Sequence, residues 1–353
     1  MTAVNPPPSL TPASQSEKPA LVAGSADHGI TAGAARAQAL ASTISRNGAV
    51  IVLVIVLIIG TLTVPTFGSA ANLGNVALAA SFIAIIAAGM TFVIISGGID
   101  LSVGSLYALA VIESAFMSER GSWAAVLVPL LSCALIGLLQ GVIIAWLRLP
   151  AFIVTLAGLT GIRGLVFLIS DEGNKHPLVS GQKTFETLGT GTFLTIGLPV
   201  WIALAVFAIG WWLLNRTPYG QSIQAIGGND MAAELMGLPV RRVKTTAYAV
   251  SGLTAGIAGV LTTALSGGGQ EANIGNAYEL SAIAAVVIGG TLLSGGVGSI
   301  VGTLAGISLL YVIQNLIVQG ASLKPYWQTV VSGFFLLLVV VVQTSLGRWA
   351  RSS

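Results

Sequence analysis

The chain has 353 residues, of which 54% are hydrophobic and only 8% are charged, and its formal net charge is +3. An average soluble domain has about 25% charged residues, so this composition excludes an ordinary soluble enzyme. Runs such as AVIVLVIVLIIGTL and FFLLLVVVV contain no charge, and about 20 such residues cross a bilayer as one helix. The sequence therefore predicts an all-α polytopic membrane protein.

Residues 1–45 are rich in Pro, Ser and Ala and lack a sustained apolar run. They are expected to form a disordered cytoplasmic tail, with a short surface helix over 34–44 as the alternative. The first apolar segment begins near Gly48, too deep in the chain for a signal peptide. A transmembrane domain is expected over 46–347, followed by a cytoplasmic C-terminus over 348–353.

Apolar runs after the tail define ten candidate spans. In chain order they cover residues 48–67, 74–96, 101–117, 123–147, 151–170, 198–215, 245–265, 280–293, 297–318 and 326–346. Two connections are long enough to hold structure of their own, 171–197 outside and 216–244 inside. Long ordered loops commonly carry function.

Basic residues are divided unevenly between the two sides that these spans define. With the N-terminus inside, ten of the 15 are cytoplasmic: Lys18, Arg36, Arg46, Arg148, Arg216, Arg241, Arg242, Lys244, Arg348 and Arg351. The outside has Arg120, Lys175, Lys183 and Lys324. Because Lys and Arg accumulate in cytoplasmic segments, both termini are predicted to be cytoplasmic.

Two distant stretches share a pattern, IAIIAAGMTFVIISGGIDLSVGS from Ile83 and SAIAAVVIGGTLLSGGVGSIVGT from Ser281. Helix breaks are predicted at the shared Ser-Gly-Gly, which places them at Gly97 and Gly98, and at Ser294, Gly295 and Gly296. Interrupted helices at matching places in two halves are typical of a duplicated transporter. The alternative is convergence of two Gly-Ser turns.

Glycines spaced by four line single helix faces, including Gly137 with Gly141, Gly252 with Gly256, and Gly302 with Gly306. Such spacing predicts close packing of neighbouring helices.

Asp100 directly follows the first predicted break. A charge inside a bilayer is costly and usually functional, but no second acid, histidine or nucleophile accompanies it. Asp100 is expected to cap the next helix through the amides near Ser102 and Val103. A structural role is favoured over direct contact with a solute.

Arg163 and Glu113 are two further ionisable residues inside the spans. Arg163 lies 13 residues after Pro150, which is about 20 Å along a helix. This places it in the outer half of the membrane, where Glu113 is a candidate partner, and both are candidate residues of a translocation path. The alternative for Arg163 is snorkelling to the outer interface.

Catalytic and metal-binding motifs are missing from the sequence. It has no G-x-S-x-G, H-E-x-x-H, C-x-x-C or G-x-x-x-x-G-K-[ST] pattern, one cysteine, Cys133, and two histidines, His28 and His176. The chain is expected to be no enzyme and to bind no metal or cofactor. Any ATP is expected on another polypeptide.

The inner loop contains QAIGGNDMAAELMGLPVRRVK, from Gln224. Asn229 is expected to cap a short helix that starts at Asp230 and carries Glu234, before Gly237 ends it and Pro239 prevents its continuation. Such a helix between two spans offers another protein a surface to hold. A plain amphipathic surface helix is the alternative.

Gly228 and Asn229, followed by Ala232, Ala233 and Gly237, resemble the coupling loop of ABC importer permeases, in which an Ala-Ala-x-x-x-Gly helix docks on the ATPase subunit. GMTFVIISGGIDLSVGS, PAFIVTLAGLTGIRGL and ELSAIAAVVIGGTLLSGGVGSIVGTLAG are similar to signature segments of the ribose-type branch. The resemblance extends from about residue 50 to residue 346. One departure is Met231, where many members have an acid.

This resemblance implies a permease of the bacterial inner membrane that forms a homodimer or heterodimer and binds two cytoplasmic ATPase domains, which hold the ATP and Mg. It implies delivery of a monosaccharide, such as ribose, xylose or galactose, by an extracytoplasmic binding protein. No nucleic-acid partner is expected.

Several alternatives remain at this point. Within the same class, the solute is alternatively a nucleoside or a branched-chain amino acid. Outside it, an ion-coupled secondary transporter would use Asp100 at its ion site. An intramembrane enzyme is disfavoured by the missing catalytic groups.

Overall fold

The computed structural model describes residues 32–179, 181–321 and the single residues 327, 330, 333, 334 and 337. The chain divides into two compact parts, Met1–Ala41 and Ser42–Ser353. Helix α1 (Ala32–Thr63) begins in the first part and includes residues 34–44, for which a short helix was the alternative to a disordered tail. Their sequence is rich in alanine, which has the highest helix propensity. Residues 1–31 and 348–353 lie outside the described residues.

The second part is mostly helical. The helices at expected spans are α2 (Ala70–Ile95), α3 (Val103–Met117), α4 (Ser122–Trp146), α5 (Ala151–Ile169), α7 (Leu198–Arg216), α10 (Val240–Ser266), α11 (Tyr278–Ile288) and α12 (Ile300–Ala321). The connections hold η1 (Ser118–Arg120), α6 (Lys183–Thr190), α8 (Pro218–Gly228), α9 (Asp230–Leu235) and the antiparallel strands β1 (Thr192–Phe193) and β2 (Ile196–Gly197).

Six of the described helices are long and apolar enough to cross a membrane: α2, α4, α5, α7, α10 and α12. The chain is therefore a multi-pass helical membrane protein. Ten spans are therefore not confirmed. Three helices at expected spans are too short to be counted, because α3 has 15 residues, α11 has 11, and the apolar part of α1 is only Gly48–Thr63. The tenth expected span, 326–346, lies outside the described residues except for five single positions.

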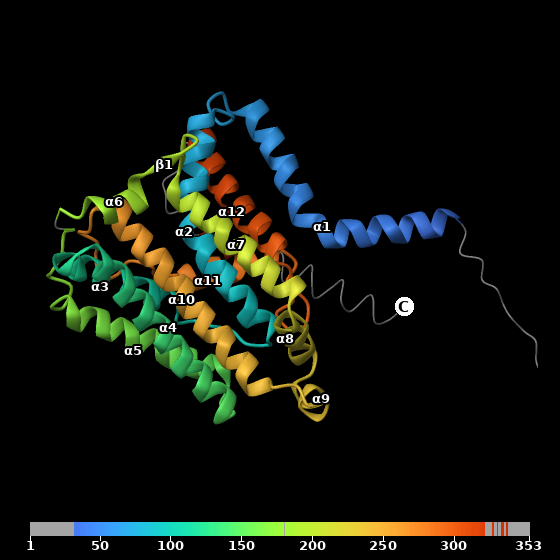
Figure 1. Cartoon of the computed structure of the whole chain (residues 1–353). Coiled ribbons are helices and arrows are strands. Elements are labelled where there is room, and N and C mark those ends of the chain that lie inside the picture. The colour runs from blue at the N-terminus through green and yellow to red at the C-terminus, as the bar shows by residue number, and fades with distance from the viewer. Residues whose placement is uncertain are drawn as a thin grey trace, which may run out of the picture. The chain divides into compact units, whose positions relative to one another are not determined.

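Helices α2 and α10 form the centre of the bundle (Figure 1). Helix α10 packs against α4, α2 and α3, and α2 also contacts α7, α11 and α12. The most apolar stretch of α2 is 83% buried, against 22% in α5 and 28% in α7. A helix that is apolar all round and buried is a core helix, whereas α5 and α7, like α4 at 33%, keep apolar surface available to lipid or to another subunit.

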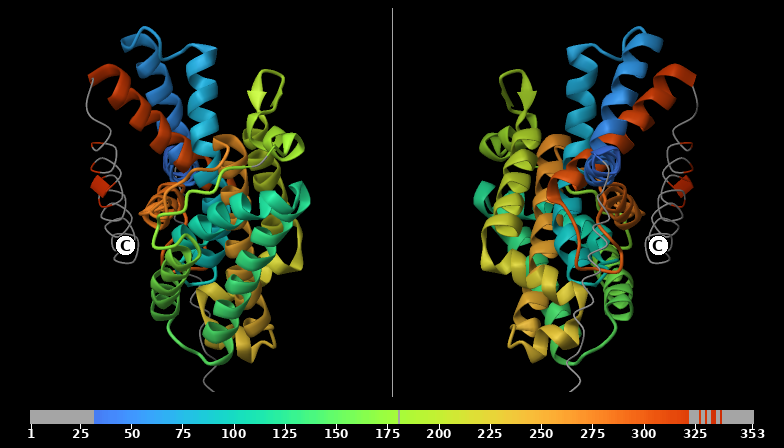
Figure 2. Two further views of the ribbon diagram at one scale, coloured as in Figure 1. Left: turned by 90° about the vertical axis from the view of Figure 1, so that its left-hand side faces the viewer. Right: turned by 90° about the vertical axis from the view of Figure 1, so that its right-hand side faces the viewer.

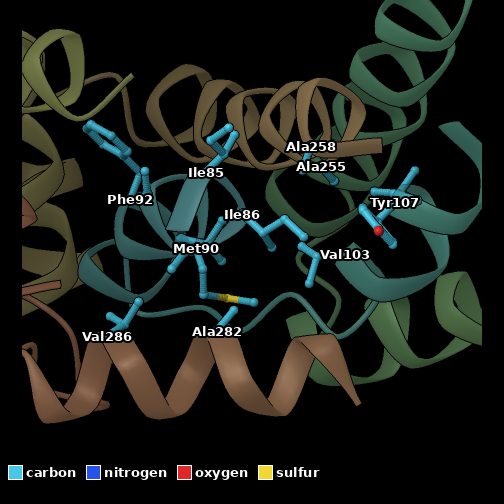
Figure 3. Packing of buried hydrophobic residues seen from close by; sticks show 14 of the residues in the cluster. Ile85, Ile86, Met90, Phe92, Val103, Tyr107, Ala255, Ala258, Ala282 and Val286 are labelled. Carbon is cyan, nitrogen blue, oxygen red and sulfur yellow. The ribbon is translucent and has the colours of Figure 1, made fainter. Parts of the chain in front are cut away.

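Small residues let the neighbouring helices approach α2 closely (Figure 3). Met90 of α2 extends toward Ala282 of α11, and Ala255 and Ala258 lie on the α10 side of the same cluster. All four side chains are almost completely buried. Short side chains at such contacts allow the van der Waals packing that holds membrane helices together.

Glycines bring two helix pairs into backbone contact, as their spacing predicts. Between α4 and α10, a methyl group added to Gly137 would lie 3.2 Å from the Cα of Gly252. Between α11 and α12, one added to Gly306 would lie 2.9 Å from the amide nitrogen of Gly289. The packing role predicted for these glycines is therefore confirmed.

The two long connections lie at opposite ends of the bundle. Helix α6 and the β-hairpin are at one end, and α8 and α9 are at the other (Figure 1). At one edge, the end of α1 lies beside α2 and α12 (Figure 2). These three helices pack around the buried side chain of Phe67. The segments that the sequence assigns to opposite sides of the membrane are thus separated in space.

Candidate functional site

The inner connection folds into two short helices joined by one residue. Thr217 caps α8 by accepting the amide of Gly220 at 3.4 Å, and Pro218 follows at the first helical position, where its missing N–H is tolerated. Asn229 ends α8 and caps α9, because its side-chain oxygen accepts the amide of Ala232 at 3.0 Å. The capping predicted for Asn229 is present. Helix α8 was missed, although Thr217-Pro218 is a helix-start signal.

Gly237 ends α9 in the left-handed backbone region, with a φ of +81°. Its amide donates to the carbonyl of Glu234 at 3.0 Å, and the amide of Leu238 donates to the carbonyl of Ala233 at 3.0 Å. This pair of bonds is the Schellman motif of a glycine-terminated helix. Gly237 therefore stops the helix as its sequence position predicts.

The apolar face of α9 consists of Met231, Leu235 and Met236, whose exposed fractions are 75%, 86% and 70%. Met231 and Leu235 are four residues apart and so lie on one side of the helix, whereas Ala233 is fully buried. Grouped exposed apolar side chains mark contact with another molecule. In the sequence, Met231 stood out only as a departure from the family pattern, and this exposed face was not predicted.

Two ion pairs connect α9 to the bundle. Asp230 pairs with Lys244 of α10, and Glu234 pairs with Arg148, in the connection between α4 and α5, at 3.1 Å. The side chains of Arg148 and Glu234 are 68% and 53% exposed, and exposed pairs of this kind contribute at most about 1 kcal/mol. The pair of Arg148 and Glu234 therefore orients α9 more than it stabilises the fold, whereas the Lys244 side chain of the other pair is only 17% exposed.

The first helix break separates α2 from α3. Gly97 has a φ of +80°, its amide donates to the carbonyl of Ile94 at 2.9 Å, and the amide of Gly98 donates to the carbonyl of Val93 at 3.0 Å. These bonds form a second Schellman motif. The break predicted at Gly97 and Gly98 is therefore present.

Asp100 is fully buried directly after this break. Its Oδ1 accepts the amide of Ser102 at 2.9 Å and the hydroxyl of Ser102 at 2.6 Å, and its Oδ2 accepts the hydroxyl of Ser251 in α10 at 2.8 Å. Buried charges require such partners. The carboxylate thus joins Ser102, the residue before α3, to α10; of the two amides expected to be capped, it accepts that of Ser102.

The second break, between α11 and α12, starts at a different glycine from the one predicted. Gly290 has a φ of +88°, and its amide donates to the carbonyl of Val287 at 2.9 Å. The amide of Thr291 donates to the carbonyl of Val286 at 3.2 Å. This is the same pair of bonds as at the first break, so Gly290 is the counterpart of Gly97. Ser294, Gly295 and Gly296 lie in the loop of this break, but the helix ends earlier than expected, at Gly289-Gly290.

A cavity of about 380 Å³ lies between α9 and the first break. Its lining includes Gly97, Gly98 and Tyr248 on one side and Asp230 and Glu234 on the other. The Tyr248 hydroxyl is buried and has no hydrogen-bond partner among the described residues. The inner helix and the first break therefore border the same space.

Arg163 and Glu113 do not form the pair that the sequence suggested. Arg163 Nη1 donates to the carbonyl oxygens of Ala272 at 2.9 Å and Ile274 at 2.7 Å, so it binds the α10–α11 connection to α5. Glu113 Oε2 instead accepts the hydroxyl of Ser132 in α4 at 2.5 Å. An acidic side chain was expected as the partner of Arg163, because backbone carbonyl partners leave no mark in a sequence. A place for either residue on a translocation path stays a prediction.

Apolar membrane-crossing helices, two glycine-terminated helix breaks and a capped inner helix with an exposed apolar face define the class: a multi-pass membrane transport protein with interrupted helices. The chain belongs to the family described as branched-chain amino acid transport system / permease component, which matches residues 72–340.

Relatives from three bacteria cover most of the chain. Ribose import permease protein RbsC of Haemophilus influenzae is 38% identical over 303 residues, which are 84% of this chain and 92% of the relative. RbsC of Escherichia coli K12 is 41% identical over 297 residues, 82% and 90% of the two chains. L-arabinose ABC transporter permease protein AraH of Azospirillum brasilense is 36% identical over 301 residues, 84% and 87%. The resemblance to ribose-type ABC permeases is confirmed.

Proposed function

We propose that this chain is the transmembrane permease subunit of an ATP-driven ABC importer that carries a monosaccharide into the cell. The observation that carries the proposal is α9, a capped helix that presents Met231, Leu235 and Met236 outward between two long spans. The ribose and L-arabinose permeases among its relatives support a pentose or similar sugar as the solute.

In the assembly that we propose, two permease chains, identical or different, bind two ATPase domains at the α8–α9 end and receive the sugar from a binding protein at the α6 end. Both termini and residues 216–244 are cytoplasmic, 171–197 is external, and the chain crosses the inner membrane ten times. ATP and Mg belong to the ATPase, so this chain contributes docking and the path but no hydrolysis.

Movement of α9 links ATP binding to the bundle in this mechanism. ATP draws the ATPase domains together and displaces the helix docked on them. The ion pairs of Asp230 with Lys244 and of Glu234 with Arg148 pass that displacement to α10 and to the α4–α5 connection. The dimer then alternates between inward and outward openings.

The ion-coupled alternative depended on Asp100 as the ion ligand. Both carboxylate oxygens of Asp100 accept hydrogen bonds from Ser102 or Ser251, which supports a structural role for Asp100 over an ion site. Branched-chain amino acids remain a second solute class because the family description names them.

Charge on the apolar face of α9 tests the docking. Met231→Glu combined with Leu235→Glu is expected to abolish co-purification of the ATPase and ATP-driven uptake, because two carboxylates must be desolvated at the contact. Leu235→Met keeps an apolar side chain of similar volume and is the matched control. Wild-type uptake by the double glutamate variant would contradict the proposal.

Competition for uptake tests the solute. Proteoliposomes with this chain and its ATPase are loaded with ATP, supplied with the binding protein outside and offered labelled ribose. Excess unlabelled arabinose, xylose or galactose, leucine or a nucleoside then identifies the solute class. Competition by leucine or by the nucleoside, with none by the sugars, would replace the monosaccharide assignment.

A further inference from the structure

Glycines from three distant parts of the chain meet at one point beside the inner helix. They are Gly97 at the end of α2, Gly227 and Gly228 at the end of α8, and Gly295 and Gly296 in the α11–α12 connection. The Ser-Gly-Gly pattern marks Gly97, Gly295 and Gly296 in the sequence, and the resemblance to coupling loops marks Gly228. Neither gives a role to Gly227, which lies at the centre of the contact.

Gly227 touches both helix breaks with its backbone. A methyl group added there would overlap the carbonyl oxygen of Ile95, the last residue of α2, and would lie 2.5 Å from the amide nitrogen of Gly296. Real side-chain contacts to backbone atoms are wider than this. Only glycine fits between the two breaks at this position.

The two breaks are also bonded directly to each other. The amide of Gly296 donates to the carbonyl of Ile95 at 2.9 Å, next to the point where Gly227 approaches. A methyl group added to Gly295 would lie 2.7 Å from the carbonyl oxygen of Gly227 and 2.9 Å from the Cα of Gly97. The three segments are therefore in contact through main-chain atoms, without side chains between them.

A single residue, Asn229, separates this contact from the inner helix α9. Asn229 donates its amide to the carbonyl of Ala225 in α8 at 3.2 Å and accepts the amide of Ala232 in α9 through its side chain. It thereby closes the last turn of one helix and the first turn of the next. Because no flexible loop lies between α9 and Gly227, a displacement of α9 also displaces Gly227.

We infer that Gly227 transmits the movement of α9 to both helix breaks at once, and that it is the positioning residue that couples ATPase docking to opening of the bundle. The inference rests on the proposed function. It differs from the route through the ion pairs of α9, because it reaches α2 and the α11–α12 connection rather than α10. A close-packed main-chain contact suits this role because it transmits displacement instead of deforming.

Gly227→Ala tests the inference in the complete transporter. The expected result is at least a tenfold loss of ATP-driven uptake, equivalent to about 1.4 kcal/mol, with the ATPase still bound and still hydrolysing ATP. The control is Gly74→Ala, the same change at a helical glycine of α2 whose added methyl group meets nothing within 4 Å. Wild-type uptake by Gly227→Ala would overturn the inference.

Hydrogen exchange of the wild-type complex decides the matter if Gly227→Ala does not assemble. On binding of ATP, amide exchange in 95–98 and 294–297 is expected to change together with exchange in 229–236. A change confined to 229–236 would overturn the inference. Uptake by the same wild-type preparation is measured in parallel, so that failure of ATP-driven transport itself is recognised separately.

Discussion

Replacement of Asp100 by alanine removes the only acidic side chain in the first helix break, residues 96–102. The carboxylate accepts three hydrogen bonds, two from Ser102 and one from Ser251. Without it, the Ser102 hydroxyl still reaches Gln140 Oε1 at 3.0 Å, and the Ser251 hydroxyl is able to turn to a carbonyl of its own helix. The Ser102 amide loses its acceptor in the variant, and the hydrogen-bonded connection between Ser102 and Ser251 of α10 is lost.

The size of the effect follows from these partners. A hydrogen bond to a charged group contributes about 1.5–3 kcal/mol, but removal of a buried charge recovers part of its desolvation cost. We therefore expect Asp100→Ala to lower the free energy of unfolding by about 2 kcal/mol. Ser251→Ala is expected to lower it by about 1 kcal/mol, close to the range measured for hydrogen bonds between membrane helices.

Thermal unfolding of the purified protein in detergent, followed by tryptophan fluorescence, measures this loss. Ser251→Ala should cost less in the Asp100→Ala background than alone, because its acceptor is already gone. Ser222→Ala is the matched control, since its exposed hydroxyl bonds only within α8. A Tm of Asp100→Ala equal to that of the wild type, or additive costs in the double variant, would refute the structural role of Asp100.

Three further predictions concern the loops at the two ends of the bundle. Ala232→Glu, at an exposed position of α9, should prevent ATPase co-purification while the Tm stays unchanged, whereas Ala233→Glu should lower the Tm because Ala233 is fully buried. Gly237→Val should cost about 1–2 kcal/mol of local strain at its positive φ, and ATPase activity measured beside uptake should show hydrolysis without transport. Arg163→Ala should speed amide exchange over 267–277, because two carbonyls of that connection lose their donor, and unchanged exchange would contradict this reading.

Apolar runs and capping residues were the parts of this fold that the sequence could predict. Gly97 and Gly237 terminate helices through backbone bonds that reach three and five positions back, so the cause and the effect are both local. The same holds for Asn229 at the start of α9. The repeated Ser-Gly-Gly pattern pointed to the loop of the second break, but the end of α11 is set earlier, by Gly289 and Gly290.

Contacts between distant segments were beyond the reach of the sequence. Arg163 binds carbonyl oxygens more than 100 positions away, and every residue offers a carbonyl, so no residue type marks the partner. Gly227 is one of 44 glycines, and it is distinguished only by its contacts with Ile95 and Gly296, which are distant in the sequence. Burial within α9 was equally unpredictable, since Ala233 is fully buried whereas its neighbour Ala232 is exposed.

The most direct test of an ATP-driven permease is solute accumulation under conditions that remove ion gradients. Proteoliposomes containing this chain, its ATPase and external loaded binding protein are supplied with internal ATP and with ionophores that collapse proton and sodium gradients. Labelled sugar is expected to accumulate above its external concentration with ATP, and not with ADP. Accumulation without ATP that disappears on addition of the ionophores would contradict the account.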